Sequence, residues 1–100
     1  MKNRLSDHEL LKFVHLVKAK LAALPAISAG DWASHDAFHR AAAGLVSELV
    51  TDHGGRLSRP LGGHRLSMAG VSATSTCGEN GVVTNWISAA YRELDRRRAT

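Results

Sequence analysis

Two histidines, His35 and His39, stand four residues apart, which on a helix places both imidazoles on one face, as metal ligands require. A zinc site would need a third and a fourth ligand, which only tertiary contact could supply; the candidates are Asp31, His53, His64 and Cys77. The residue after the first histidine is not the glutamate of metalloprotease helices. We therefore predict no metal site and no cofactor, and we keep a small metal-binding protein or enzyme as the least favoured hypothesis.

The single cysteine, Cys77, lies near the expected start of a helix, where a thiol can become a reactive thiolate. A nucleophile also needs a base and a group that orients the base, and the sequence identifies neither. We therefore predict that the protein is not an enzyme. One cysteine allows no intramolecular disulfide, so nothing in the sequence suggests an oxidising compartment.

Arginine is the residue type with the most distinctive placement. The net charge of +4 arises entirely in residues 56–100, because residues 1–55 carry equal numbers of acidic and basic side chains. Residues 56–77 contain no acidic residue at all. The guanidinium group offers a planar set of donors that suits phosphate and carboxylate. We predict a binding surface for an anionic partner made of Arg56, Arg59, His64, Arg65, Ser67, Arg96 and Arg97.

The stretch between Gly62 and Gly81 is rich in glycine and hydroxyl side chains. Such a stretch before a helix can hold a phosphate through backbone N–H groups, although no Gly-Lys-Ser/Thr follows here. The alternative is a polar connector without a ligand.

Three helices must position these residues. Ser6 and Glu9 form a capping box at the start of the first helix, which Pro25 ends. The second helix begins after Ser28, Asp31 or Ser34 and runs to about His53, with Gly54 beyond its end. The third begins near Thr76 or Cys77, or as late as Asn80, and its C-terminus carries Arg96–Arg98. Apolar residues at helical spacing predict a shared core of Leu10, Val14, Val17, Leu21, Phe38, Leu45, Leu49, Ile87 and Leu94.

The segment 56–77 is too long for a structureless connection in a small domain. It could contain a β-hairpin in which residues 57–59 pair with residues 65–68 across the Pro60–Gly63 loop. We predict an all-α fold: one helical domain over residues 1–100, with an irregular or β-hairpin segment between the second and third helices. Trp32 is expected to cover the edge of the core.

Ala69, Gly70, Val71 and Ser72 resemble the turn of bacterial helix-turn-helix regulators, in which this tetrapeptide links the first helix to the recognition helix. The resemblance covers these four residues only, and it implies that Ser72, Thr74 and Ser75 face DNA. It departs from the family pattern at Gly62 and Gly63, which occupy the place of the first helix.

These observations favour a non-enzymatic binding module for an anionic partner, with nucleic acid first. A small protein-binding regulator or inhibitor of the kind that phages and mobile elements encode is the alternative, and its target could be a nucleoprotein. A homodimer through the apolar stripe of the first helix is a further expectation. The sequence shows no signal peptide and no apolar run long enough to cross a bilayer, so we expect a cytoplasmic protein without a membrane partner.

Overall fold

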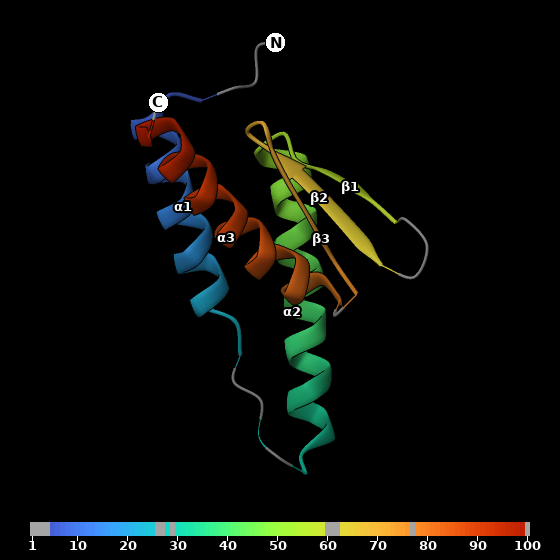
Figure 1. Ribbon diagram of the computed structural model, residues 1–100. Helices are drawn as coiled ribbons and strands as arrows, with labels where there is room; N and C mark the ends of the chain where they lie inside the picture. Colours follow the sequence, from blue (N-terminus) through green and yellow to red (C-terminus); the bar gives the residue numbers. More distant parts are fainter. Residues whose placement is uncertain (1–4, 26–27, 29, 60–62, 77, 100) are drawn as a thin grey trace.

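The computed structural model in Figure 1 describes residues 5–25, 28, 30–59, 63–76 and 78–99. Three helices and three strands follow one another in the order α1 (Asp7–Ala22), α2 (Trp32–Asp52), β1 (Arg56–Ser58), β2 (His64–Met68), β3 (Val71–Ser75) and α3 (Gly78–Ala99). The predicted all-α class is therefore wrong, and the protein is a mixed α/β protein. The hairpin alternative was correct for β1 and β2, whereas β3 was not foreseen.

The three strands form one antiparallel sheet in the order β1-β2-β3. Leu57 pairs with Leu66, and Leu66 pairs with Ala73 on its other side. Along β2, Leu66 and Met68 are buried, whereas Arg65 is exposed and Ser67, between the two buried residues, is half-buried. This period of two belongs to a half-buried strand and differs from the helical periodicity of the flanking segments.

A two-residue turn, Ala69 and Gly70, joins β2 to β3, since Met68 pairs with Val71. Both turn residues have positive φ, +53° for Ala69 and +79° for Gly70. Positive φ at both central positions defines the type I′ turn that matches the twist of a hairpin. The resemblance to a helix-turn-helix regulator is thereby overturned, because strands rather than helices flank this turn.

The predicted starts of α1 and α2 and the predicted end of α2 are confirmed, whereas α1 ends at Ala22, before Pro25. The Ser6 hydroxyl accepts from the Glu9 N–H at 3.2 Å, and the Glu9 carboxylate accepts from the Ser6 N–H at 3.0 Å. Asp31 caps α2 by accepting from the N–H groups of Ala33 and Ser34. Gly54, just beyond α2, has a φ of +71°. The predicted cap of α3 at Cys77 lies outside the described residues.

Helix α3 is the centre of the packing. It contacts α1, α2, β2 and β3, and Figure 1 shows it crossing between α1 and the sheet. The indole N–H of Trp86, a fully buried side chain, lies 3.3 Å from the Met68 carbonyl oxygen and 3.1 Å from that of Val71. The indole N–H of Trp86 therefore links α3 to the two residues that flank the β2–β3 turn.

The core confirms most of the predicted residues and adds strand residues to them. Of the predicted set, Leu21 is partly buried against the core, and Phe38 is half-buried outside the core cluster. The sheet supplies Leu66, Met68 and Val71. The buried residues of α1, namely Leu10, Val14 and Val17, pack inside this chain. These three residues therefore belong to the shared core, as their helical spacing predicted.

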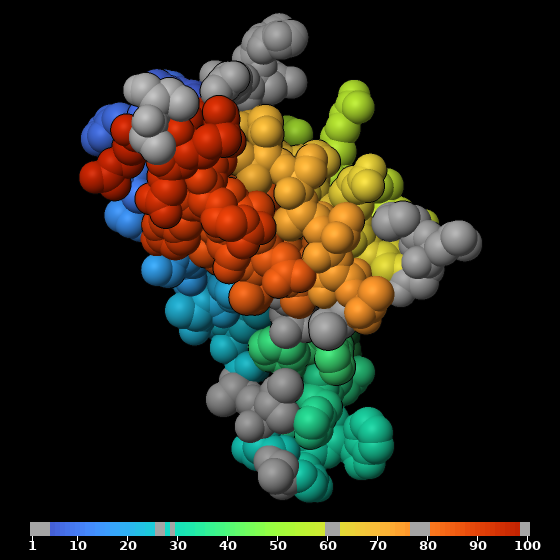
Figure 2. Space-filling view, in the orientation of Figure 1, coloured from blue at the N-terminus to red at the C-terminus, as the bar shows by residue number. Residues whose placement is uncertain are grey.

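The first half of α2 extends beyond the rest of the molecule (Figures 1 and 2). The whole molecule measures 48 × 28 × 24 Å along its principal axes. Trp32, the first residue of α2, is 86% exposed, so the expectation that it covers the core edge was wrong. At this end α2 has left the body of the protein, and Trp32 does not belong to the core cluster of the described residues.

Candidate functional site

One face of the sheet packs on the helices and the other faces solvent. Successive side chains of a strand point to opposite faces of the sheet. Because Leu66 and Met68 lie on the packed face, Arg65 and Ser67 lie on the opposite face. The register carries this alternation across the sheet, since Ser67 pairs with both Arg56 and Ser72. We call this set the outer sheet face, and it consists of Arg56, Ser58, Arg65, Ser67, Ser72 and Thr74.

The chemistry of the outer sheet face is uniform. It offers two guanidinium groups and four hydroxyl groups, with neither an acidic nor an apolar side chain among them. Arg56 and Arg65 lie on a diagonal, each flanked across the strands by hydroxyl residues. The Ser67 and Ser72 hydroxyl oxygens are 2.7 Å apart and share one hydrogen bond. Within the described residues, no carboxylate forms an ion pair with either arginine.

Two other predicted residues lie near this face but do not belong to it. Arg59 is exposed and directly follows the last residue of β1, so its side chain is available at the end of the sheet. His64 begins β2 with the same alternation as Leu66, which places it on the packed side. Its Nδ1 atom is buried and has no hydrogen-bond partner in the part of the chain that the structure describes.

The remaining predicted residues, Arg96 and Arg97, are engaged within the chain. Arg97 is only 10% exposed at its side chain, and it donates to the Leu5 carbonyl oxygen, to Asp7 at 3.0 Å and to Glu93 at 2.9 Å. It joins the end of α3 to the start of α1. Arg96 donates to both oxygens of the Glu93 carboxylate, at 3.0 and 2.7 Å. Hydrogen bonds from Arg96 and Arg97 lower the pKa of Glu93 to about 2.

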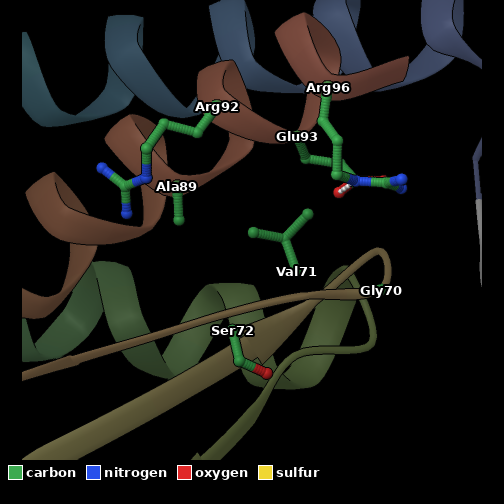
Figure 3. A pocket seen from close by; sticks show the side chains of 7 residues that line it. All are labelled: Gly70, Val71, Ser72, Ala89, Arg92, Glu93 and Arg96. Carbon is green, nitrogen blue, oxygen red and sulfur yellow. Dashed lines mark hydrogen bonds and ion pairs between the residues drawn. The ribbon is translucent and has the colours of Figure 1, made fainter. Parts of the chain in front are cut away.

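Sequence reasoning missed Arg92, which the structure places in a groove between α3 and β3. Two adjoining shallow pockets of about 270 Å³ each share Ser72 and Arg92 in their linings. Figure 3 shows the one nearer the turn, where Val71 points toward α3 and Ser72 points away from it. The signal was present as a polar helical stripe of Asn85, Ser88, Arg92 and Arg96, but its meaning depends on β3, which was not predicted.

The other candidate chemistry receives no support from the geometry. His35 and His39 both lie on α2, yet no group of three metal-ligating side chains occurs among the described residues. The glycine-rich stretch forms β2, a tight turn and β3 where it is described, rather than an open loop. Cys77 lies outside the described residues. No described helix is both long and apolar enough to cross a bilayer.

Trp32 marks a second surface, remote from the sheet in sequence and placement. Together with Gly30, Asp31 and His35 it lines a pocket of about 270 Å³ at the protruding start of α2. The ring centroids of Trp32 and His35 are 6.0 Å apart. Tryptophan is enriched in protein interfaces because it covers a large apolar area and also offers a donor.

Comparisons with protein-family models, with curated proteins and with solved structures found no match to this chain.

Proposed function

We propose that this protein is a small non-enzymatic binding protein that holds nucleic acid against its outer sheet face. The observation that carries the proposal is the composition of that face, which is arginine and hydroxyl residues alone. Arginine binds phosphate through paired N–H donors, and serine and threonine hydroxyls donate to phosphate oxygens. Arg59, at the end of β1, extends the positive surface.

The same composition favours a duplex over an unpaired strand. Proteins that bind single strands stack the bases on aromatic side chains. None of the six residues of the outer sheet face is aromatic. A face of this kind contacts the phosphate backbone and gives little discrimination between sequences.

Fluorescence anisotropy of labelled duplex and single-stranded oligonucleotides at 50 and 200 mM salt tests the proposal. If Arg56, Arg59 and Arg65 each contact one phosphate, affinity falls about 40-fold over that range, given a slope of roughly −0.9 per phosphate. Replacing Arg56 and Arg65 by glutamine should leave a salt effect of only about 3- to 4-fold and much weaker binding at low salt.

The matched control is Lys12→Gln with Arg40→Gln, which removes the same charge from exposed positions on α1 and α2. This control should retain most of the affinity, since neither residue lies on the sheet. Equal weakening in both double variants would show that net charge alone attracts the nucleic acid. Absence of binding at 50 mM salt would remove the proposal.

The exposed Trp32 favours a second candidate function, a protein-binding regulator that uses the start of α2. Affinity capture from a host lysate with the intact protein, Trp32→Ala and the Arg56/Arg65 double variant separates the two functions. A protein that is captured by the intact chain and the arginine variant but not by Trp32→Ala supports this candidate. A homodimer through α1 stays a prediction, and it would have to use the exposed Leu11 and Leu16.

A further inference from the structure

The two edges of the sheet differ in how they are protected. Edge strands usually carry charged residues or proline, which hinder the addition of another strand. The edge strand β1 contains Arg56 and is followed by Arg59. The opposite edge strand, β3, has the sequence Val-Ser-Ala-Thr-Ser, with neither a charged residue nor a proline. β3 therefore lacks these two obstacles to strand addition.

The register shows which backbone groups of β3 are directed outward. The two-residue turn makes Met68 and Val71 a hydrogen-bonded pair, so Ser72 and Thr74 occupy non-hydrogen-bonded positions opposite β2. Their N–H and carbonyl groups consequently turn away from β2. The side-chain amide of Asn85 confirms this direction at Thr74, because it donates to the outward carbonyl oxygen at 2.8 Å.

A groove runs along this edge, with α3 as its other wall. The two adjoining pockets follow β3 from Thr74 back to Gly70. Five residues of strand span about 17 Å, which matches an extended peptide of about five residues. In Figure 3, Arg92 stands on one side of the pocket nearer the turn, and Arg96 with Glu93 stands on the other.

The charge of the groove identifies the kind of strand that it accepts. Arg92 is exposed, and no ion pair joins it to another described residue. Glu93 is the only acidic residue among the described residues that line the two pockets, and Arg96 and Arg97 already bind it. A second copy of β3 would bring no carboxylate to Arg92, because residues 71–75 contain none. Charge complementarity therefore favours a foreign acidic segment over self-pairing.

We propose that the groove between β3 and α3 binds an extended acidic peptide, which adds to the sheet as a fourth strand beside β3. Backbone hydrogen bonds at Ser72 and Thr74 give affinity, and a carboxylate of the peptide pairs with Arg92. Binding displaces the Asn85 side chain from the Thr74 carbonyl oxygen. This site adjoins the outer sheet face of the proposed function at Ser72 and Thr74, but it uses their backbone groups and Arg92 rather than their hydroxyl groups with Arg56 and Arg65.

The test uses a fluorescein-labelled eight-residue peptide in which aspartate and valine alternate, with anisotropy as the readout. Arg92→Gln should weaken binding at least about tenfold, the effect of losing one hydrogen bond between charged groups. Arg98→Gln removes the same charge from an exposed position of α3 that lines neither pocket, and it should bind as the intact protein does. The lysine-valine counterpart of the peptide should not bind.

Two N-methylated peptides distinguish strand addition from simple charge attraction. An added strand pairs through one edge only, so methylation of one alternating set of amides should abolish binding and methylation of the other set should not. Hydrogen exchange at the Ser72 and Thr74 amides should slow when the unmodified peptide binds. Equal binding of both methylated peptides, or no slowing at these amides, would overturn the proposal.

The Arg56/Arg65 double variant makes failure here distinguishable from failure of the proposed function. It should keep the peptide affinity of the intact protein while losing affinity for nucleic acid, and Arg92→Gln should show the reverse. If Arg92→Gln lowers nucleic-acid affinity as much as the double variant does, and the peptide does not bind, the groove belongs to the nucleic-acid surface and the peptide proposal is wrong.

Discussion

The turn between β2 and β3 contains an unusual residue, and its replacement should raise the stability of the protein. Ala69 has a φ of +53°, in the left-handed region that asparagine and glycine tolerate better than alanine does. An alanine there costs roughly 1–2 kcal/mol relative to ordinary backbone. Asparagine followed by glycine is the favoured pair for a type I′ turn. Ala69→Asn should therefore raise the free energy of unfolding by about 0.5–1 kcal/mol.

Two other substitutions at position 69 give reference values for this gain in stability. Ala69→Gly relieves the same strain, but the greater freedom of glycine in the unfolded chain offsets about 0.5–1 kcal/mol, so the net change should be small. Ala69→Val places a β-branched side chain at positive φ and should destabilise the protein by about 1–3 kcal/mol. Gly70→Ala, at a φ of +79°, is the matched control and should cost about 1–2 kcal/mol.

Urea denaturation followed by circular dichroism measures these differences, and thermal unfolding supplies a second readout. For a domain of this size 1 kcal/mol corresponds to about 4–8 °C in Tm, so Ala69→Asn should gain about 2–8 °C. The expected order of stability is Asn, then Ala and Gly together, then Val. An asparagine variant less stable than the intact protein, or a valine variant equal to it, would show that the turn is not of type I′. Nucleic-acid binding should be unchanged in Ala69→Asn, because the register of the outer sheet face is preserved.

Three further predictions concern the core and the end of α3. Leu49→Ala should cost about 2–5 kcal/mol in urea denaturation because Leu49 is fully buried, and a loss below about 1 kcal/mol would contradict its assignment to the core. Trp86→Phe should cost about 1–3 kcal/mol, since the carbonyl groups of Met68 and Val71 lose a buried donor; Trp32→Phe, at an exposed position, is the control and should change stability little. Glu93→Gln should be less stable than the intact protein at neutral pH. Because the pKa of Glu93 is about 2 when folded and 4.5 ordinarily, this difference should shrink as pH falls from 4.5 toward 2, and a difference independent of pH would exclude the carboxylate as its source.

The helices and much of the core were predictable because their signals are local. The capping box of α1 needs only Ser6 and Glu9, and the end of α2 is marked by Gly54, which adopts positive φ. The buried faces of these helices repeat within a few turns of one chain segment, so the sequence shows them without knowledge of their partners.

The sheet was harder to predict because its strands are short and polar on one face. β3 contains only Val71 as a large apolar residue, and its turn has alanine where asparagine or glycine is expected. The sequence signal for β3 was therefore weak. In addition, the turn and the first two residues of β3 (residues 69–72) resembled the turn of a helix-turn-helix regulator. Trp32 was misplaced for a related reason, since the sequence does not show that the start of α2 protrudes from the body.

The amino-acid sequence alone shows that the excess positive charge is arginine and that it lies in residues 56–100. How those arginines are divided among different surfaces follows from the packing of the chain. Strand pairing brought Arg56 and Arg65 together on the outer sheet face, while helix packing placed Arg97 in an ion pair with Asp7 and left Arg92 beside β3. The physical reason is that a side chain's role depends on its neighbours across the sheet and between helices, and those neighbours are distant in sequence.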